Sequence, residues 1–145
     1  MRALAVFAAL LAAGAVHAQI RSDGGAVYIA GDRFSLEQAI ADATLENVGP
    51  DASTPFQIVA MGSESRKLTV KGTKRNVREA VRRIQGAGGT FYICERDVKQ
   101  LGLSQKDLLP GVRIERGWTQ KELTQPSGNG NASVPPALRR IRRIC

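Results

Sequence analysis

Four short apolar runs, separated by polar segments with helical spacing, constrain the fold of this chain more than any other feature. The runs cover residues 26–31, 56–61, 90–93 and 112–114. Each is short and apolar, as is typical of strands buried on both faces. Strands that alternate with helices predict a parallel sheet covered by helices on both of its faces.

Two of the segments between these runs have the pattern of amphipathic helices. The first covers residues 36–46 behind Ser35, a favourable N-cap residue. The second covers residues 76–84, where apolar side chains fall at i, i+3, i+4 and i+7. Residues 68–70 fit either a short extra strand or a loop. The segment 119–123 is long enough for little more than one helical turn, so the predicted fold is shortened at its C-terminal end.

The N-terminus has the pattern of a secretory signal peptide. Arg2 precedes a long apolar run, and Val16 and Ala18 occupy the small-residue positions before a cleavage site. The run is shorter than the ~20 residues that span a bilayer, which disfavours a membrane anchor. We therefore expect residues 1–18 to be a signal peptide and the mature protein to be periplasmic or secreted.

Removing the first 18 of the 145 residues leaves 127, enough for one domain with one modest core. The net charge falls from +8 to +7, and the only histidine, His17, is lost. A mature chain without histidine excludes Ser–His and Cys–His catalysis and histidine metal sites within the chain. Two cysteines cannot form a cysteine-only zinc site, and no glycine-rich phosphate or dinucleotide motif is present. No cofactor or metal is expected.

Cys94 is the residue with the clearest chemical potential. It ends the third apolar run, and the polar residues Glu95, Arg96 and Asp97 follow at once. This pattern predicts a strand that delivers a thiol to the beginning of a helix, where partial positive charge lowers the pKa of a thiol. The alternative is a structural cysteine, because unpaired cysteine is among the most buried residue types.

Residues 90–114 resemble a known family. The run Thr90-Phe91-Tyr92-Ile93-Cys94, then Leu101-Gly102-Leu103, then Asp107-Leu108-Leu109-Pro110-Gly111-Val112, is similar to the DsrE/DsrF-like sulfur-relay family. The resemblance covers roughly residues 26–118 and places a DsrE-like domain at 24–123. It implies a flavodoxin-like α/β fold, a homo-oligomer, and persulfide sulfur carried on Cys94.

The resulting hypothesis is an exported sulfur carrier or sulfurtransferase. Cys94 would take up sulfur, Arg96 would stabilise its anion, and Cys145 would act as a resolving thiol. The partners would be a donor or acceptor protein or a small sulfur compound. The alternative is a non-catalytic binding or assembly module of the same fold, in which Cys94 is structural.

The last segment, residues 124–145, has the composition of a flexible linker followed by a basic tail. Four arginines in residues 137–145 could meet an acidic partner or a membrane surface, whereas nucleic acid is not expected for an exported protein. Apolar residues recur every third position from Leu138 to Ile144, so the tail could be a docking helix or a solvated end. For Cys145 the sequence leaves open a bridge to Cys94, a bridge to another chain and an unpaired thiol.

Overall fold

The computed structural model describes residues 19–20, 25–49, 54–124 and 134–145. The predicted signal peptide and most of the predicted linker lie outside these residues. The strands are β1 (Gln19–Ile20), β2 (Val27–Ala30), β3 (Phe56–Ala60), β4 (Gly89–Cys94) and β5 (Arg113–Glu115). The α-helices are α1 (Leu36–Asn47), α2 (Arg75–Gly86), α3 (Glu95–Gln100), α4 (Gln120–Thr124) and α5 (Pro136–Ile144), and the 3-10 helices are η1 (Gly62–Leu68) and η2 (Gln105–Asp107).

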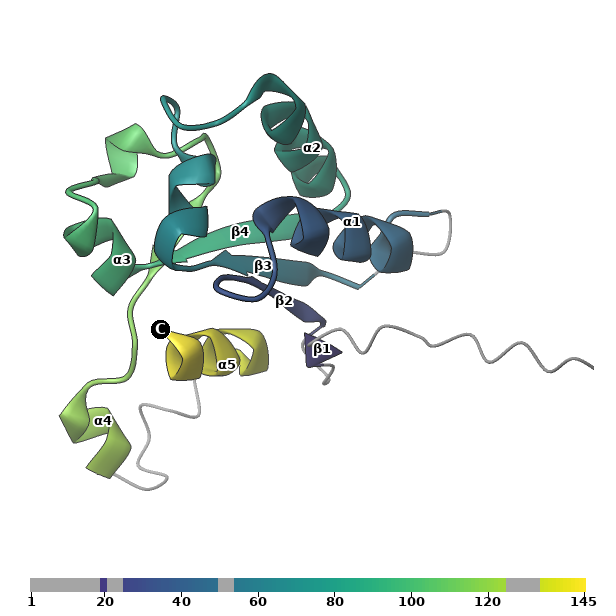
Figure 1. The fold of residues 1–145 in the computed structure, drawn as a ribbon. Helices are drawn as coiled ribbons and strands as arrows, with labels where there is room; N and C mark the ends of the chain where they lie inside the picture. Colours follow the sequence, from purple (N-terminus) through teal and green to yellow (C-terminus); the bar gives the residue numbers. More distant parts are fainter. Residues whose placement is uncertain (1–18, 21–24, 50–53, 125–133) are drawn as a thin grey trace, which may run out of the picture.

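The described strands form one sheet in the order β1-β2-β3-β4-β5. The four strands from β2 to β5 run parallel, and the two-residue strand β1 pairs antiparallel with β2 at one edge. Helices lie on both sides of this sheet (Figure 1). The predicted flavodoxin-like α/β fold, a parallel sheet with helices on both faces, is confirmed.

The sequential strand order decides which helices cover which face. Crossover connections between parallel strands are almost always right-handed, so strands added one after another in one direction place every crossover on the same side. The helices α1, α2 and α3 accordingly share one face of the sheet, and α5 lies across the other (Figure 1). The second face therefore depends on a C-terminal helix for its cover.

The larger core lies between the sheet and the crossover helices. Inward-pointing strand residues such as Tyr28, Ile58 and Phe91 meet Leu36 of α1 and Val81 of α2 there. Because successive strand side chains alternate between faces, their sequence neighbours point to the opposite side of the sheet. Those neighbours form the smaller core under α5, which comprises Val27, Val59, Tyr92, Cys94 and Ile141, with Ile29, Met61, Leu138, Ile144 and Cys145 packed against it.

Most helices and strands form where the sequence predicts them. Ser35 is the N-cap of α1, and its hydroxyl accepts a hydrogen bond of 3.1 Å from the backbone N–H of Gln38. Two exceptions are β1, which no apolar run predicted, and the segment before α2. Residues 62–68 form η1, and only Thr69 bridges to Leu108, so the possible strand at 68–70 is reduced to an isolated β-bridge.

Candidate functional site

Cys94 lies at the carboxyl end of β4 and is the N-cap residue of α3. The predicted placement, a cysteine at the edge of the sheet next to a helix N-terminus, is confirmed. Its side chain belongs to the core under α5 and is fully buried. A reactive cysteine needs an accessible thiol, and in this state of the protein Cys94 is not exposed because α5 covers it.

A disulfide joins Cys94 to Cys145, the residue that follows α5. Their Cα atoms are 5.1 Å apart, although 51 positions separate them in the sequence. Of the three possibilities left open for Cys145, the structure has the intramolecular bridge. Closing a loop of this length in the unfolded chain accounts for about 4 kcal/mol of stability in the chain-entropy model.

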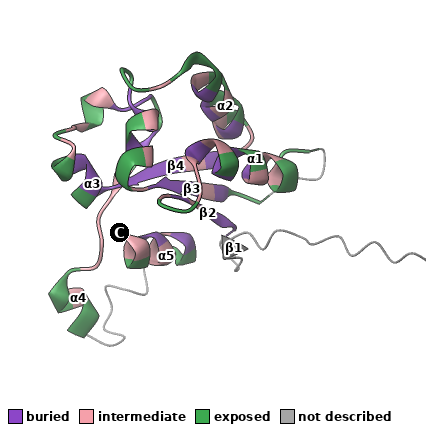
Figure 2. Cartoon of the chain, viewed as in Figure 1, coloured by how far each residue is buried: buried purple, intermediate pink, exposed green. Residues whose placement is uncertain are grey.

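Helix α5 docks on the sheet through a narrow apolar stripe. Ala137 and Ile141 are buried, while Leu138 and Ile144 are partly covered. Figure 2 shows the buried and partly buried part of α5 along the side that faces the strands. The apolar residues that recur in the tail thus belong to a docking helix, and the surface on which it docks is the sheet of the same chain.

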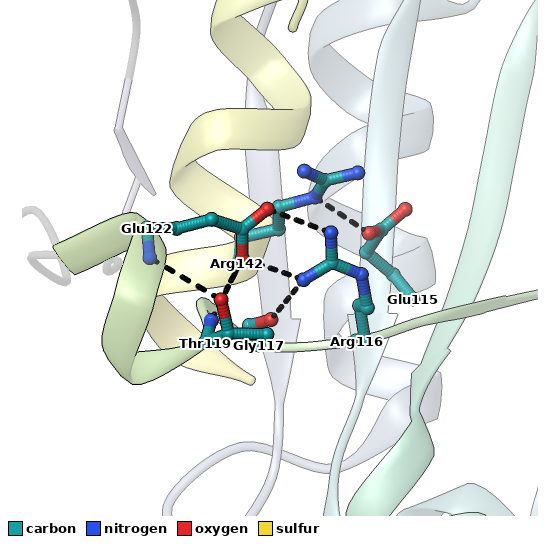
Figure 3. Close-up of polar contacts among 6 residues, drawn as sticks. All are labelled: Glu115, Arg116, Gly117, Thr119, Glu122 and Arg142. Carbon is teal, nitrogen blue, oxygen red and sulfur yellow. Dashed lines mark hydrogen bonds and ion pairs between the residues drawn. The ribbon is translucent and has the colours of Figure 1, made fainter. Parts of the chain in front are cut away.

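Arginines of α5 reinforce this docking with polar contacts. Nε of Arg142 donates to Oε1 of Glu115 at 2.8 Å, and both side chains are largely buried, with exposed fractions of 16% and 13%. The guanidinium of Arg142 also lies 5.3 Å from the ring centre of Trp118. Figure 3 shows Arg142 reaching from α5 toward Glu115 on β5. One arginine of the basic tail is therefore committed to holding the helix on the sheet.

The segment between β5 and α4 runs close to the end of α5. A Cβ atom on Gly117 would lie 2.8 Å from the carbonyl carbon of Cys145, so glycine is required for this approach. Next to it, Arg116 donates two hydrogen bonds of 2.7 Å to the carboxylate of Glu122 (Figure 3). That bidentate contact, with further hydrogen bonds from Thr119, holds the pKa of Glu122 far below its usual range.

A cleft of about 530 Å³ opens beyond the carboxyl ends of β2 and β3 and beside α3. Ligands of open α/β sheets bind outside the carboxyl ends of the strands. The lining residues are Ile29, Gly31, Asp32, Arg33, Phe34, Met61, Gly62, Arg96, Asp97 and Gln100. Ile29 and Met61 also pack against the core that contains the disulfide.

The structure separates the three predicted site residues into two places. Cys94 and Cys145 are joined, whereas Arg96 lines the cleft with 56% of its side chain exposed. Nε of Arg96 lies 3.8 Å from Oδ1 of Asp97, a long ion pair. Asp97 is buried, and its Oδ2 accepts a hydrogen bond of 3.0 Å from the backbone N–H of Gly62. This carboxylate thereby connects the turn after β3 to α3.

Sequence reasoning missed most of the cleft. The apolar runs at 26–31 and 56–61 predicted two of the strands that end at the cleft, but nothing in the sequence connected Arg33, before α1, with Arg96, in α3. Within the described ranges, no group of three or more histidine, cysteine, aspartate or glutamate side chains could hold a metal ion. In the same part of the chain, no helix is both long and apolar enough to cross a membrane.

No protein-family model matches the chain, and no curated protein matches it. Among solved structures, MTH1491 from Methanobacterium thermoautotrophicum, a protein of unknown function, is 20% identical, with a TM-score of 0.47 over 61% of this chain and 76% of that one. The ychN protein from E. coli is also 20% identical, with a TM-score of 0.42 over 67% of this chain and 84% of that one. These likenesses are distant, and function has to be argued from this chain's own residues.

Proposed function

We propose that this protein handles sulfur through Cys94, which carries it as a persulfide, with Cys145 as the resolving thiol. The observation that carries the proposal is the disulfide between the two cysteines at the carboxyl end of β4. A resolving cysteine must reach the sulfur-carrying one, and Cys145 does so. The resemblance of residues 90–114 to the DsrE/DsrF-like family supports the same reading.

The cycle begins with the reduction of the bridge. A dithiol, the reductant, breaks the Cys94–Cys145 bond by exchange and is itself oxidised to a disulfide. The Cys94 thiolate then attacks the outer sulfur of a persulfide donor, R–S–SH. The donor's S–S bond breaks, R–S⁻ leaves and takes up a proton, and Cys94 carries the persulfide.

Two outcomes follow from a persulfide on Cys94. An acceptor thiolate that attacks the outer sulfur takes it up as a new persulfide and leaves Cys94 as a thiolate. Alternatively, the Cys145 thiolate attacks the Cys94 sulfur, hydrosulfide leaves, and the disulfide forms again. The second route returns the protein to the state in the structure.

The proposal includes an exported location, periplasmic or secreted. Disulfides form and persist in oxidising compartments, and the bridge agrees with the signal-peptide pattern of residues 1–18. It also includes a sulfur donor or acceptor, protein or small compound, and a homo-oligomeric state. An acidic partner or membrane surface for the basic tail, in which Arg143 is the exposed arginine of α5, belongs to the same proposal.

The test is persulfide loading of the pre-reduced protein, followed by mass spectrometry of its peptides. Cys145→Ser should accumulate one additional sulfur atom on the Cys94 peptide, because no resolving thiol is present. The unmodified chain should release hydrosulfide and regain the disulfide. Cys94→Ser serves as the control and should gain no sulfur on Cys145. A reduced Cys94 that reacts with donors or alkylating reagents only after denaturation would refute the proposal.

The second candidate is a binding or assembly module in which the bridge is a permanent clamp. The complete burial of Cys94 under α5 favours it. A clamp and a catalytic bridge differ in reducibility. A permanent clamp should resist dithiols under native conditions, and binding to a partner should be unchanged after treatment with a dithiol followed by an alkylating reagent.

A further inference from the structure

We infer that the cleft beside α3 is a binding site for a small zwitterionic thiol compound, one that has both a carboxylate and an ammonium group. The inference rests on the proposed function and names its substrate class: an amino-acid-derived persulfide that delivers sulfur to Cys94. Three properties of the cleft carry it, namely its size and place, its charged groups and its apolar floor.

The size and place of the cleft fit a small molecule. Its volume of about 530 Å³ lies within the range of ligand pockets, ~300–1,000 Å³. The residues after β2, after β3 and after β4 all contribute to it. Cys94 itself ends β4, and Arg96 and Asp97 follow it by two and three positions.

The charged groups of the cleft have both signs. Arg33 and Arg96 bring two guanidinium groups from separate elements of the fold. Among the described residues no carboxylate pairs with Arg33, and the contact of Arg96 with Asp97 is long at 3.8 Å. Planar guanidinium groups bind carboxylates through paired N–H donors, so the two arginines provide a carboxylate site.

The acidic side of the cleft is supplied by Asp32. Asp97 is already committed to the backbone of Gly62, whereas Asp32 is exposed and lies next to Arg33 in the chain. An ammonium group on the same ligand would pair with Asp32. A ligand that carries both groups matches this arrangement better than a simple anion, because Asp32 opposes a second negative charge.

The apolar floor connects the cleft to the cysteines. Ile29 and Met61 line the cleft and also pack against the core that holds Cys94 and Cys145. A ligand bound through its carboxylate and ammonium groups would rest its sulfur-bearing part on these side chains. Release of α5 after reduction would then open the way from the floor to Cys94.

The experiment is titration of the oxidised full-length protein with S-methylcysteine, followed by calorimetry and by the NMR signals of Gly31 and Gly62. This probe has the carboxylate and ammonium groups but no thiol, so it cannot exchange with the bridge. Arg33→Gln and Arg96→Gln should each weaken binding roughly tenfold, as expected for loss of a charge-assisted contact. Arg83→Gln, an exposed arginine on α2 away from the cleft, is the matched control and should bind normally.

Two chemical variants of the probe test the two charged groups separately. The esterified probe should bind the native protein, Arg33→Gln and Arg96→Gln with the same affinity, because the arginines then have no carboxylate to bind. The N-acetylated probe should bind the native protein more weakly than the free probe does. Asp32→Asn should bind both probes with the same affinity. The inference would be overturned if the probe did not bind, if Arg33→Gln and Arg96→Gln bound it as tightly as the native protein does, or if the native protein bound the esterified probe as tightly as the free one.

This experiment is independent of the reactivity of Cys94, because the bridge stays closed. Binding without persulfide loading would reject the proposed function and keep the cleft as a ligand site. Persulfide loading that is equally fast from neutral donors would keep the proposed function and reject the cleft as its substrate site.

Discussion

At the scale of single residues, the C-terminal bridge depends on close approaches that tolerate little change. Cys94 is fully buried, and Cys145 reaches it from the end of a nine-residue helix. Gly117 lies against the backbone of Cys145, and Glu115 pairs with Arg142 one turn earlier in α5. Residues on β5 and on the segment after β5 thus position the end of α5, and with it Cys145, next to Cys94.

Gly117→Ala should loosen the docking of α5. The added Cβ atom would lie 2.8 Å from the Cys145 carbonyl carbon, so the end of α5 must shift. Overpacking of this kind costs about 1–3 kcal/mol, which chemical denaturation of the oxidised protein measures. Gly86→Ala is the control, because a Cβ atom there meets nothing within 4 Å. Equal stability of the two variants would contradict the close approach.

The Arg116–Glu122 contact predicts a pH dependence at the beginning of α4. The pKa of Glu122 is lowered from its ordinary value of 4.5, first by the hydrogen bonds from Arg116 and then by those from Thr119. The folded carboxylate therefore binds its proton more weakly than the unfolded one. The stabilisation is complete above pH 4.5 and is lost only as the pH falls through the lower, folded value.

NMR titration of the Thr119 amide, which donates to Glu122 at 2.8 Å, measures this directly. The midpoint should lie clearly below 4.5 in the native protein and rise toward 4.5 in Arg116→Gln. Glu122→Gln should remove the transition. A native midpoint at or above 4.5 would show that the ion pair does not form in solution.

At the scale of elements, α5 is a short helix that depends on its covalent and tertiary contacts. Isolated helices below ~12–15 residues are marginal in water, and α5 has nine residues. Its first residue is Pro136, and its apolar stripe is narrow. The bridge to Cys94 and the Arg142–Glu115 pair therefore supply stability that a helix of this length lacks on its own.

Reduction of the disulfide should therefore release α5, and Trp118 reports it. Trp118 is the only tryptophan and lies under the guanidinium of Arg142. Dithiol treatment should shift its emission to longer wavelength and allow trypsin to cleave α5 after Arg139, which is half-buried while the helix is docked. Cys94→Ser should show the shifted emission before any reductant is added and no further change afterwards. Identical emission from oxidised and reduced protein would mean that α5 stays docked without the bridge.

At the scale of the whole molecule, the strand order leaves one face of the sheet without crossover helices. Every described crossover from β2 to β5 lies on the other side, with α1, α2 and α3 (Figure 1). The uncovered face carries apolar side chains along β2, β3 and β4. Helix α5 is therefore both the cover of this face and the element that closes over Cys94.

A chain that ends at Thr124 should expose this face. Val27, Val59 and Tyr92 would lose their cover, and an apolar patch of that kind binds hydrophobic dyes and promotes self-association. Dye fluorescence and light scattering measure the two effects. The control is the unmodified oxidised chain, in which the bridge holds α5 on this face and little dye should bind. A truncated chain that is monomeric and binds no dye would refute the covering role of α5.

The local patterns of the sequence were sufficient to predict the local structure. Apolar runs placed β2 to β5, spacing placed α1 and α2, and Ser35 was identified as an N-cap. The position of Cys94 at a strand end before a helix also followed from neighbouring residues alone. Strand alternation and helical periodicity depend on short-range geometry, and short stretches of sequence report them well.

The tertiary structure decided which distant residues meet. Recurring apolar residues in the tail fitted a docking helix. The face on which α5 docks is uncovered only because the strand order places every described crossover on the other side of the sheet. Cys145 had three possible fates, and the end of α5 over β4 selects one of them. Arg33 and Arg96 line one cleft because the ends of β2 and β4 meet at the same edge of a parallel sheet. Contacts between residues that are far apart in the sequence depend on the strand order, and composition and local spacing do not determine that order.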